Sequence, residues 1–303
     1  MKFSLVIPVA PNRNAEIIDS IKKTNYSKED YEIIVKGGLN PSENRNRGAK
    51  EAKGKIIAFL DDDAFIEENL LKNAEKFFEE HPEIDIIGGA QLTPKEQKGF
   101  GKISGYALSS KFGAWKMETR YSLQKPNLNA DETMLTSANL FCKKEVMKKI
   151  QFDVNLFPGE DPKFIEDAKN AGFKVAYSPN LIIYHKRRET VKALVKQISS
   201  YGETRTKKES FFQTLKKPFF LIPSLFFMYL VSLSILAFFN VLPIVRFILL
   251  IPLFVYLELD LLFSIYESVK KRNPLSFFML IWIFPLIHLS YGLGMIKGYL
   301  KRR

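Results

Sequence analysis

Three consecutive acids, Asp61, Asp62 and Asp63, directly follow the uninterrupted apolar run Ile56–Leu60. Such a run is typical of a strand buried on both faces of a parallel sheet. Carboxylates are costly in a core unless they are paired or bind a cation, and ligands of open α/β sheets bind at the carboxyl ends of strands. We therefore interpret the triplet as a metal and phosphate site. The alternative is that an aspartate caps a following helix over Ile66–His81.

Asp61 and Asp63 are the predicted metal ligands. Alternate residues of an extended segment point the same way, so these two carboxylates can reach one cation while Asp62 points elsewhere. Mg²⁺ or Mn²⁺ bound by one or two carboxylates is commonly completed by substrate phosphates. Its function would be to offset the charge on a leaving diphosphate.

A second acidic pair, Glu160 and Asp161, follows Gly159 at the predicted start of a helix that ends near Ala171. Two acids at a helix start can simply stabilise its N-terminus. Together with a metal site, they also offer a general base that takes a proton from an attacking acceptor hydroxyl.

A basic set follows the last predicted strand: His185, Lys186, Arg187 and Arg188, with Arg205 further on. Basic clusters beside a membrane segment commonly contact lipid headgroups. At a strand end they can also bind a diphosphate, and His185 can be a third metal ligand.

The elements that position these residues alternate between strands and helices. Strands are predicted over 3–9, 31–35, 55–60, 84–89, 134–142, 173–177 and 181–185, and helices over 15–24, 41–48, 66–81, 143–150 and 160–171. Residues 91–129 are expected to be rich in loops, with some helix over 106–112. This pattern predicts an α/β domain of Rossmann-like type with a mostly parallel sheet.

The chain has 303 residues and a formal net charge of +12, which would suit nucleic acid or an anionic membrane surface. After about Lys217 long apolar runs replace mixed charge, and this distribution favours the membrane and argues against nucleic acid. A single cysteine, Cys142, excludes an intrachain disulfide and is read as a buried hydrophobe. The start of the chain has no signal-peptide pattern, so a cytoplasmic first domain is expected. We predict a catalytic domain over 1–206 and a membrane region over 207–303.

Three apolar segments follow. Pro218–Phe239 and Leu275–Ile296 are long enough to span a bilayer, whereas Val241–Phe263 carries charges and suits a re-entrant or interfacial segment equally well. Basic residues near 207–217, at 270–272 and at 301–303 would all be cytoplasmic by the positive-inside rule, which three simple spans cannot satisfy. Gly292 and Gly294 are expected to let the last helix pack closely.

At this point an ordered set of motifs resembles glycosyltransferase family 2, the inverting enzymes of the GT-A fold. The motifs are Leu5–Pro8, Arg45–Gly48, Gly54–Asp63, Gly159–Asp161 and Tyr184–His185. A weaker likeness to the succinoglycan-synthesis branch rests on Ala107–Gly113, Arg120, Gln197, Tyr201–Gly202 and Arg205.

The resemblance implies residue roles. Asp161 would be the catalytic base, and Glu160 would orient it. Asp61, Asp63 and His185 would bind the metal. The nucleotide sugar would contact Pro8, Arg45, Arg47, Asp61, Asp62 and Arg188.

One departure from the family pattern lies at the end of the second strand. The family usually has acids there that contact the nucleotide base, whereas this chain has Lys36, Gly37 and Gly38. The choice between uridine and guanosine therefore stays open.

The sequence thus predicts a multi-pass, metal-dependent glycosyltransferase at the cytoplasmic membrane face, with a nucleotide-sugar donor and a lipid-linked saccharide acceptor. A polyprenyl phosphate acceptor and an inactive, transferase-like membrane scaffold are the alternatives, and homo-oligomerisation stays open. A nucleotidyltransferase is disfavoured because Val9–Asn14 contains no glycine. The Gln-x-x-Arg-Trp motif of processive synthases is missing after Gln197, which argues against long polymer synthesis.

Overall fold

A computed structural model describes residues 1–240 and 242–301, and the chain forms two compact units. The first unit comprises Met1–Gln97 and Lys116–Arg187, and the second comprises Lys98–Trp115 and the chain from Arg188 onward. The boundary predicted at residue 206 falls inside helix α8, Val191–Lys208, which belongs to the second unit.

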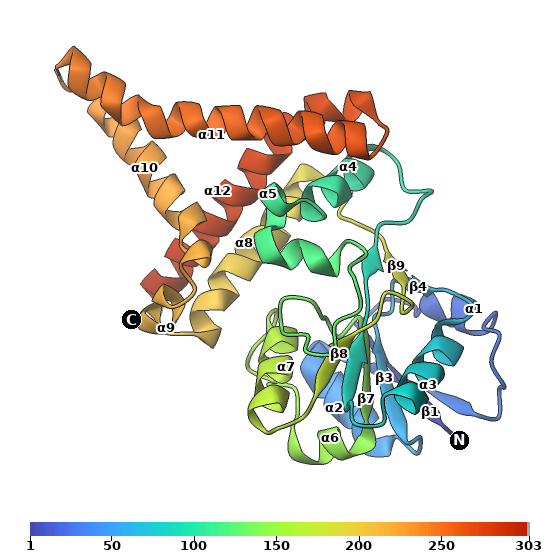
Figure 1. Ribbon diagram of the computed structural model, residues 1–303. Coiled ribbons are helices and arrows are strands. Elements are labelled where there is room, and N and C mark those ends of the chain that lie inside the picture. The colour runs from blue at the N-terminus through green and yellow to red at the C-terminus, as the bar shows by residue number, and fades with distance from the viewer. Residues whose placement is uncertain (241, 302–303) are drawn as a thin grey trace. The chain divides into compact units, whose positions relative to one another are not determined.

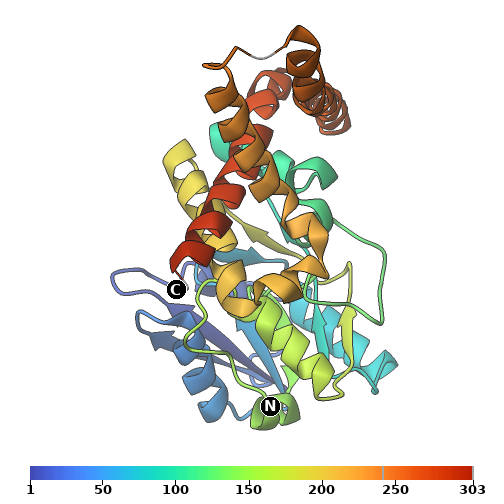
Figure 2. The same cartoon turned by 90° about the vertical axis from the view of Figure 1, so that its left-hand side faces the viewer.

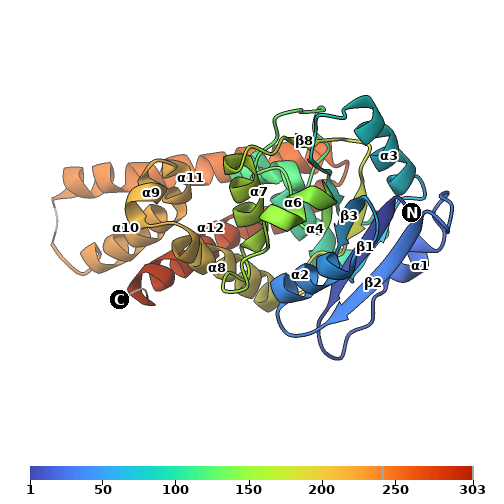
Figure 3. The same ribbon diagram turned by 90° about the horizontal axis from the view of Figure 1, so that it is seen from below.

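The first unit is built on a six-stranded sheet in the order β2-β1-β3-β7-β5-β8. Strand β7 is antiparallel to both of its neighbours and the other pairs are parallel, so the predicted α/β class is confirmed and the sheet is mixed. Figure 3 shows β2, β1 and β3 side by side. The strands are β1 (Phe3–Val9), β2 (Tyr31–Gly37), β3 (Ile56–Leu60), β5 (Ile86–Gly88), β7 (Asn139–Lys143) and β8 (Val175–Tyr177).

Two hydrophobic cores cover the two faces of this sheet. Leu5 and Ile7 of β1 join one core and Val6 joins the other, because successive strand residues point to opposite faces. Both faces are apolar, which is why β1 and β3 are continuous apolar runs rather than alternating ones.

Helices supply the outer side of each core. The first core contains residues of α1 (Ile17–Ile21) and α3 (Leu70–Glu80). The second contains residues of α2 (Pro41–Glu51), α6 (Lys144–Lys149) and α7 (Glu160–Asn170).

The segment after the three aspartates differs from the expected helix. A short strand, β4 (Ala64–Ile66), comes first, and α3 begins only at Leu70 with Asn69 at its N-cap. The alternative that an aspartate of the triplet caps this helix is therefore wrong. Strand β4 belongs to a second, three-stranded sheet in the order β4-β9-β6, with β6 over Gln91–Leu92 and β9 over Ile183–His185.

The region expected to be rich in loops contains more helix than predicted. Helix α4 spans Gly99–Leu108, α5 spans Lys111–Ala114, and a 3-10 helix, η1, spans Trp115–Arg120. The first two belong to the second unit, so tertiary packing stabilises a segment whose own pattern is weak.

The apolar segments of the second unit form helices of very different lengths (Figure 1). Helix α10, Ile222–Leu236, has 15 residues, which is shorter than the roughly 20 that cross a bilayer core. Helix α11, Pro243–Lys270, is one continuous helix of 28 residues, and Pro274–Lys301 is a second stretch long and apolar enough to span. The expectation for the first two apolar segments is therefore wrong. The first, which was expected to span, forms a helix too short to do so, and the second, which was ambiguous, forms one that is long enough.

The remaining elements of this unit are three short ones and one long helix. The short ones are α9 (Phe211–Leu215) and the 3-10 helices η2 (Pro218–Phe220) and η3 (Pro274–Ser276), and the long one is the last helix, α12 (Phe277–Lys301). Predictions for Val241, Arg302 and Arg303 lie outside the described residues.

Helix α8 packs along α12, as Figure 1 and Figure 2 show. Glycines allow this approach: a Cβ at Gly202 would lie 2.2 Å from the Tyr291 carbonyl oxygen, and one at Gly294 would lie 2.0 Å from that of Ser199. A Cβ at Gly292 would meet Pro223 at 2.3 Å, beside α10. The expected close packing of the last helix at Gly292 and Gly294 is confirmed.

Candidate active site

Two short strands bring His185 to the aspartates at the end of β3. Strand β4 pairs antiparallel with β9, and this register places Ala64 opposite His185. The Nε2 atom of His185 lies 2.9 Å from Oδ1 of Asp63 and 3.7 Å from Oδ2 of Asp61. Residues far apart in the sequence therefore converge at the carboxyl end of a buried strand.

The donor set of this group suits a divalent cation. One ligand atom each from Asp61, Asp63 and His185 lies within 4.8 Å of the others. Two carboxylates are the ligands that Mg²⁺ and Mn²⁺ prefer. The Nδ1 atom of His185 lies 3.0 Å from the Lys186 carbonyl oxygen, an acceptor that favours a proton on Nδ1 and leaves Nε2 for a metal. The three side chains therefore fit the predicted metal site.

The same side chains are strongly coupled electrostatically. Burial alone would lower the pKa of His185, but its hydrogen bonds to Asp61 and Asp63 raise that pKa to about 9. Burial opposes the ionised form of both aspartates as well, yet contact with His185 holds their pKa values below the usual range. Without a cation, His185 is thus a positive charge that partly neutralises the two acids.

Asp62 is not part of the metal group, which comprises Asp61, Asp63 and His185. It is buried, its Oδ1 lies 3.2 Å from Arg13, and its Oδ2 has no hydrogen-bond partner among the described residues. Burial, with the neighbouring charge of Asp63, raises the pKa of Asp62 to about 6.

Arg13 is a site residue that sequence reasoning missed. Its Nη2 donates to Oδ2 of Asp63 at 2.8 Å and also contacts Asp62. The available signal was its place in the loop after β1, because β1 is the parallel neighbour of β3 and both strands end at the same edge of the sheet.

Arg45 connects the metal group to the second acidic pair. This buried residue of α2 donates from Nη2 to Asp61 at 3.0 Å and from Nη1 to Glu160 at 2.8 Å. Its guanidinium also lies 5.5 Å from the centre of the Phe152 ring. One side chain thus fixes the end of β3 relative to the start of α7.

Glu160 and Asp161 occupy different environments in the first turn of α7. Glu160 is buried, and this burial, with the charge of Asp161, raises its pKa to about 7 despite the ion pair with Arg45. Asp161 is only half-buried and accepts a hydrogen bond from the Ser137 hydroxyl. Asp161 is therefore the more accessible carboxylate of the two.

Three predicted donor contacts differ in their surroundings. Pro8 is buried within β1, in register with Lys36. Arg47 is exposed, and two residues along a helix turn it away from the face that carries Arg45. Arg188 is exposed and belongs to the second unit.

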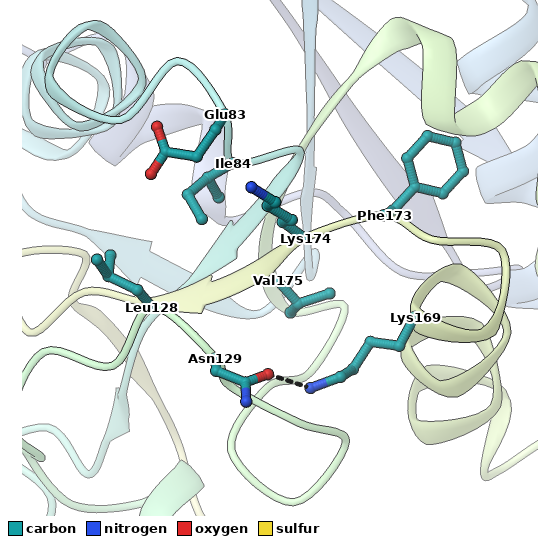
Figure 4. Close-up of a pocket in the computed structure, with 8 residues that line it drawn as sticks. All are labelled: Glu83, Ile84, Leu128, Asn129, Lys169, Phe173, Lys174 and Val175. Atoms are coloured by element: carbon teal, nitrogen blue, oxygen red, sulfur yellow. Dashed lines mark hydrogen bonds between the residues drawn. The ribbon is translucent and has the colours of Figure 1, made fainter.

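A cavity of about 380 Å³ in the first unit lies elsewhere (Figure 4). It opens at the amino ends of β5 and β8, the opposite end of the sheet from the acid cluster. Lys169 donates to Asn129 across it at 2.9 Å. Its lining residues are Glu83, Ile84, Leu128, Asn129, Lys169, Phe173, Lys174 and Val175.

Comparisons with known proteins agree with this geometry. Residues 1–199 match the family described as "Glycosyltransferase like family 2". Minor teichoic acid biosynthesis protein GgaB of Bacillus subtilis (strain 168) is 30% identical over 181 residues, which are 59% of this chain and only 17% of that protein. The chain therefore spans about a sixth of that relative's length.

A second relative matches over nearly the whole chain. It is the dolichyl N-acetyl-alpha-D-glucosaminyl phosphate 3-beta-D-2,3-diacetamido-2,3-dideoxy-beta-D-glucuronosyltransferase of Methanococcus voltae, 22% identical over 99% of this chain and 97% of its own length.

Among solved structures, the mannosyltransferase PcManGT from Pyrobaculum calidifontis, in complex with GDP-Man and Mn²⁺, matches with a TM-score of 0.64 and 11% identity. The match covers 100% of this chain and 88% of that one, and this likeness shows the fold that the sequence resemblance implied. The chain belongs to glycosyltransferase family 2 and is a nucleotide-sugar-dependent glycosyltransferase with a GT-A-like domain.

Proposed function

We propose that this enzyme is an inverting, metal-dependent glycosyltransferase that moves a sugar from a nucleotide donor to a lipid-linked saccharide at the cytoplasmic face of a membrane. The observation that carries the proposal is the Arg45 bridge, which joins the acid group at the end of β3 to the acids at the start of α7. A diphosphate site and a base must lie this close for one displacement to use both.

Asp61, Asp63 and His185 are the proposed metal ligands. A bound Mg²⁺ or Mn²⁺ would offset the negative charge that develops on the leaving nucleoside diphosphate. Arg13, in contact with Asp63, adds a second positive charge at the same place. We assign Asp61 and Asp62 to the donor side of the site, together with Pro8, Arg47 and Arg188 as predicted contacts.

Asp161 is the proposed base. It takes the proton of the acceptor hydroxyl while that oxygen forms a bond to the anomeric carbon and the bond from that carbon to the diphosphate oxygen breaks. A single displacement of this kind inverts the anomeric configuration. The half-buried position of Asp161 supports this role, and the Ser137 hydroxyl orients its carboxylate.

Glu160 and Arg45 are the proposed positioning residues. Both are buried, and each of the outer guanidinium nitrogens of Arg45 already contacts a protein carboxylate. This arrangement favours a role for Arg45 in holding Asp61 and α7, in place of a direct donor contact.

The acceptor class follows from the chemistry of the nucleophile. A phosphate with a second pKa of about 6 is already largely ionised at neutral pH and needs no base, whereas a sugar hydroxyl does. The acids of α7 therefore favour a lipid-linked saccharide over a polyprenyl phosphate. The name of the Methanococcus voltae relative, which describes transfer to a dolichyl N-acetylglucosaminyl phosphate, supports the same class.

The membrane location is supported by α11. Only 11% of the residues in its most apolar stretch are buried inside the structure, and side chains such as Phe247, Phe254 and Leu262 are exposed. An exposed apolar surface of this size is typical of contact with lipid.

The test uses the full chain in lipid nanodiscs. Binding of UDP-, GDP- and dTDP-sugars is measured with Mn²⁺ and with a chelator, and transfer is measured to a lipid-linked saccharide and to a polyprenyl phosphate. We expect one donor to bind in a metal-dependent way, binding to fall at least tenfold in Asp61→Asn with Asp63→Asn, and Asp161→Asn to retain donor binding but lose transfer. Asp19→Asn, an exposed change on α1, is the matched control.

Two outcomes contradict the proposal. Full turnover by Asp161→Asn would exclude the hydroxyl mechanism and favour the phosphate acceptor. Absence of binding by every donor, with a folded chain and metal present, would favour the scaffold.

A further inference from the structure

Strand β2 forms an open edge of the main sheet in the first unit. It pairs with β1 on one side, and no strand of the described residues pairs with its other side. Figure 3 shows β2 beside β1 with no strand beyond it. The strand is seven residues long, and Val35 on it is 44% exposed. A long, partly apolar edge of this kind is a template for pairing with another strand.

The contacts with β1 show which backbone groups of β2 point outward. The Phe3 amide donates to the Asp30 carbonyl at 3.0 Å, and the Gly38 amide donates to the Val9 carbonyl at 3.1 Å. Even-numbered residues of this segment therefore face β1, because the backbone groups of successive strand residues point to alternate sides. The odd-numbered residues of β2 direct their N–H and C=O groups away from the sheet: Tyr31, Ile33, Val35 and Gly37.

The side chains of β2 are complementary to a second, antiparallel copy of the same strand. When Ile34 lies opposite its own copy, Glu32 of each strand lies opposite Lys36 of the other. This register is the one that places these opposite charges directly across from each other, and it pairs all seven residues of the strand. Opposite charges at facing positions stabilise a strand pair, whereas like charges oppose it.

The same register also satisfies the backbone of both strands. Residues that exchange hydrogen bonds in an antiparallel pair must both point toward the partner strand. Here each outward residue lies opposite another outward residue, as Ile33 does opposite Val35. Glu32 and Lys36 fall at the positions between, where the strands approach more closely and facing side chains meet. Charge pairing and backbone geometry are therefore satisfied by one register.

Contacts within the chain already order the two charged side chains. Lys36 lies 2.6 Å from Glu51, and Glu32 accepts hydrogen bonds from the Ser4 hydroxyl and the Lys53 amide. A side chain that is ordered before association loses less entropy when it binds. An ammonium group has three donors, so Lys36 can contact its own Glu51 and a facing carboxylate together.

We propose that β2 is a homodimer interface, in which the β2 strands of two copies pair antiparallel about a two-fold axis at Ile34. The two main sheets then form one continuous sheet. A second copy is the partner that the charges favour, because the order of glutamate and lysine along β2 is reversed in an antiparallel copy of itself. A lysine alone on an edge discourages pairing, but here Glu32 supplies its counterpart. The two-fold pairing also covers both open edges and so ends further association.

The first experiment is disulfide cross-linking of the full chain in uncharged detergent under a mild oxidant. Ile34→Cys places two thiols at the axis, where the Cα atoms of facing residues are about 4.5 Å apart, within the range of a disulfide. Ile33→Cys is the matched control: it is half-buried like Ile34, but it lies out of register with its own copy and too far from it for a disulfide. Cys142 is fully buried and gives no background.

The second experiment measures the monomer–dimer equilibrium by light scattering over a range of concentrations. Val35→Pro removes an outward N–H and leaves the hydrogen bonds to β1 in place, as edge strands tolerate. Lys36→Glu sets like charges opposite each other, and the exposed Lys50→Glu on α2 makes the same charge change away from the edge. Melting temperatures show whether each variant is folded.

We expect Ile34→Cys to cross-link into a dimer and Ile33→Cys to remain largely uncross-linked. The dissociation constant of the dimer is expected to rise about tenfold or more in Val35→Pro and Lys36→Glu and to stay nearly unchanged in Lys50→Glu. A monomeric wild type, equal cross-linking of the two cysteine variants, or an undiminished dimer in folded Val35→Pro would overturn the interface. The cysteine pair decides the register even if Val35→Pro folds poorly.

Discussion

Arg13 and the proposed metal ion would compete for the same carboxylate. The Arg13 guanidinium contacts Asp63 at 2.8 Å, and Asp63 is also a proposed metal ligand. Because Arg13 is a half-exposed cation, its ion pair stabilises the metal-free site by about 1 kcal/mol at most.

Replacing Arg13 with glutamine is expected to tighten Mn²⁺ binding about fivefold in the absence of donor, because about 1 kcal/mol of competing interaction is removed. Donor affinity in the presence of Mn²⁺ is expected to fall, since a positive charge beside the diphosphate is lost. Calorimetric titration of Mn²⁺ and then of donor measures both, with Lys22→Gln as the exposed control. Weaker Mn²⁺ binding by the variant would contradict the competition.

Glu160 gives the first unit a pH dependence with a defined sign. Its pKa of about 7 in the folded chain lies above its ordinary value of 4.5, so the folded state binds the proton more tightly than the unfolded state. The free energy of unfolding therefore rises as the pH falls from about 7 toward 4.5.

Comparison with Glu160→Gln isolates this effect, because glutamine does not titrate. Between pH 8 and pH 5.5, the wild type is expected to gain about 2 kcal/mol of stability relative to the variant, which is about 4 to 8 °C in melting temperature. Melting temperatures are recorded with chelator present. A difference between wild type and variant that is the same at both pH values would show that the Arg45 ion pair keeps Glu160 ionised throughout.

At the scale of elements, two pairings decide where the chemistry lies. The short pairing of β4 with β9 brings His185 to the aspartates, and the packing of α2 against the main sheet brings Arg45 between β3 and α7. The second unit depends in the same way on close helix contact, where glycines of α8 and α12 meet backbone atoms.

Gly294→Val is expected to destabilise the second unit by about 2 kcal/mol or more, because a side chain there overlaps the Ser199 carbonyl and forces α12 away from α8. Leu300→Val, at an exposed position of the same helix, introduces the same branched side chain without a close neighbour and serves as the control. Thermal unfolding in nanodiscs measures both. A melting temperature for Gly294→Val equal to that of the control would mean that the two helices separate at no cost.

For the whole molecule, the proposed membrane location predicts which side of the membrane the turn between the two long apolar helices faces. The end of α11 and the turn after it carry Lys270, Lys271 and Arg272, and the positive-inside rule places such a basic segment in the cytoplasm. The single cysteine makes this measurable, because Cys142 is fully buried and its burial raises the thiol pKa.

Asn273→Cys is therefore expected to resist a membrane-impermeant maleimide in intact cells and to react once the membrane is opened. The unchanged chain provides the background, which should be close to zero because a buried thiol of high pKa is unreactive. Labelling of Asn273→Cys in intact cells would place this turn outside, and the rule would then fail for this chain.

Much of the fold follows from the sequence. Continuous apolar runs such as Ile56–Leu60 can be stable only between two helical layers, so the α/β sheet and its two cores were predictable from pattern alone. The three residues of the candidate metal group were predictable too, because Asp61 and Asp63 follow such a strand and His185 ends another. These are local signals, and they depend on residue type and strand ends.

Tertiary structure alone decided the contacts between distant segments. Nothing local to Arg13 or Arg45 indicates that the first pairs with Asp63 and that the second joins Asp61 to Glu160, because each pair depends on how strands and helices far apart in sequence are brought together. The antiparallel direction of β7, the separate β4-β9-β6 sheet and the unbroken length of α11 were likewise undetermined by pattern. Hydrophobic periodicity determines which faces are buried, but the partner of each polar group is set by the packing of the whole chain.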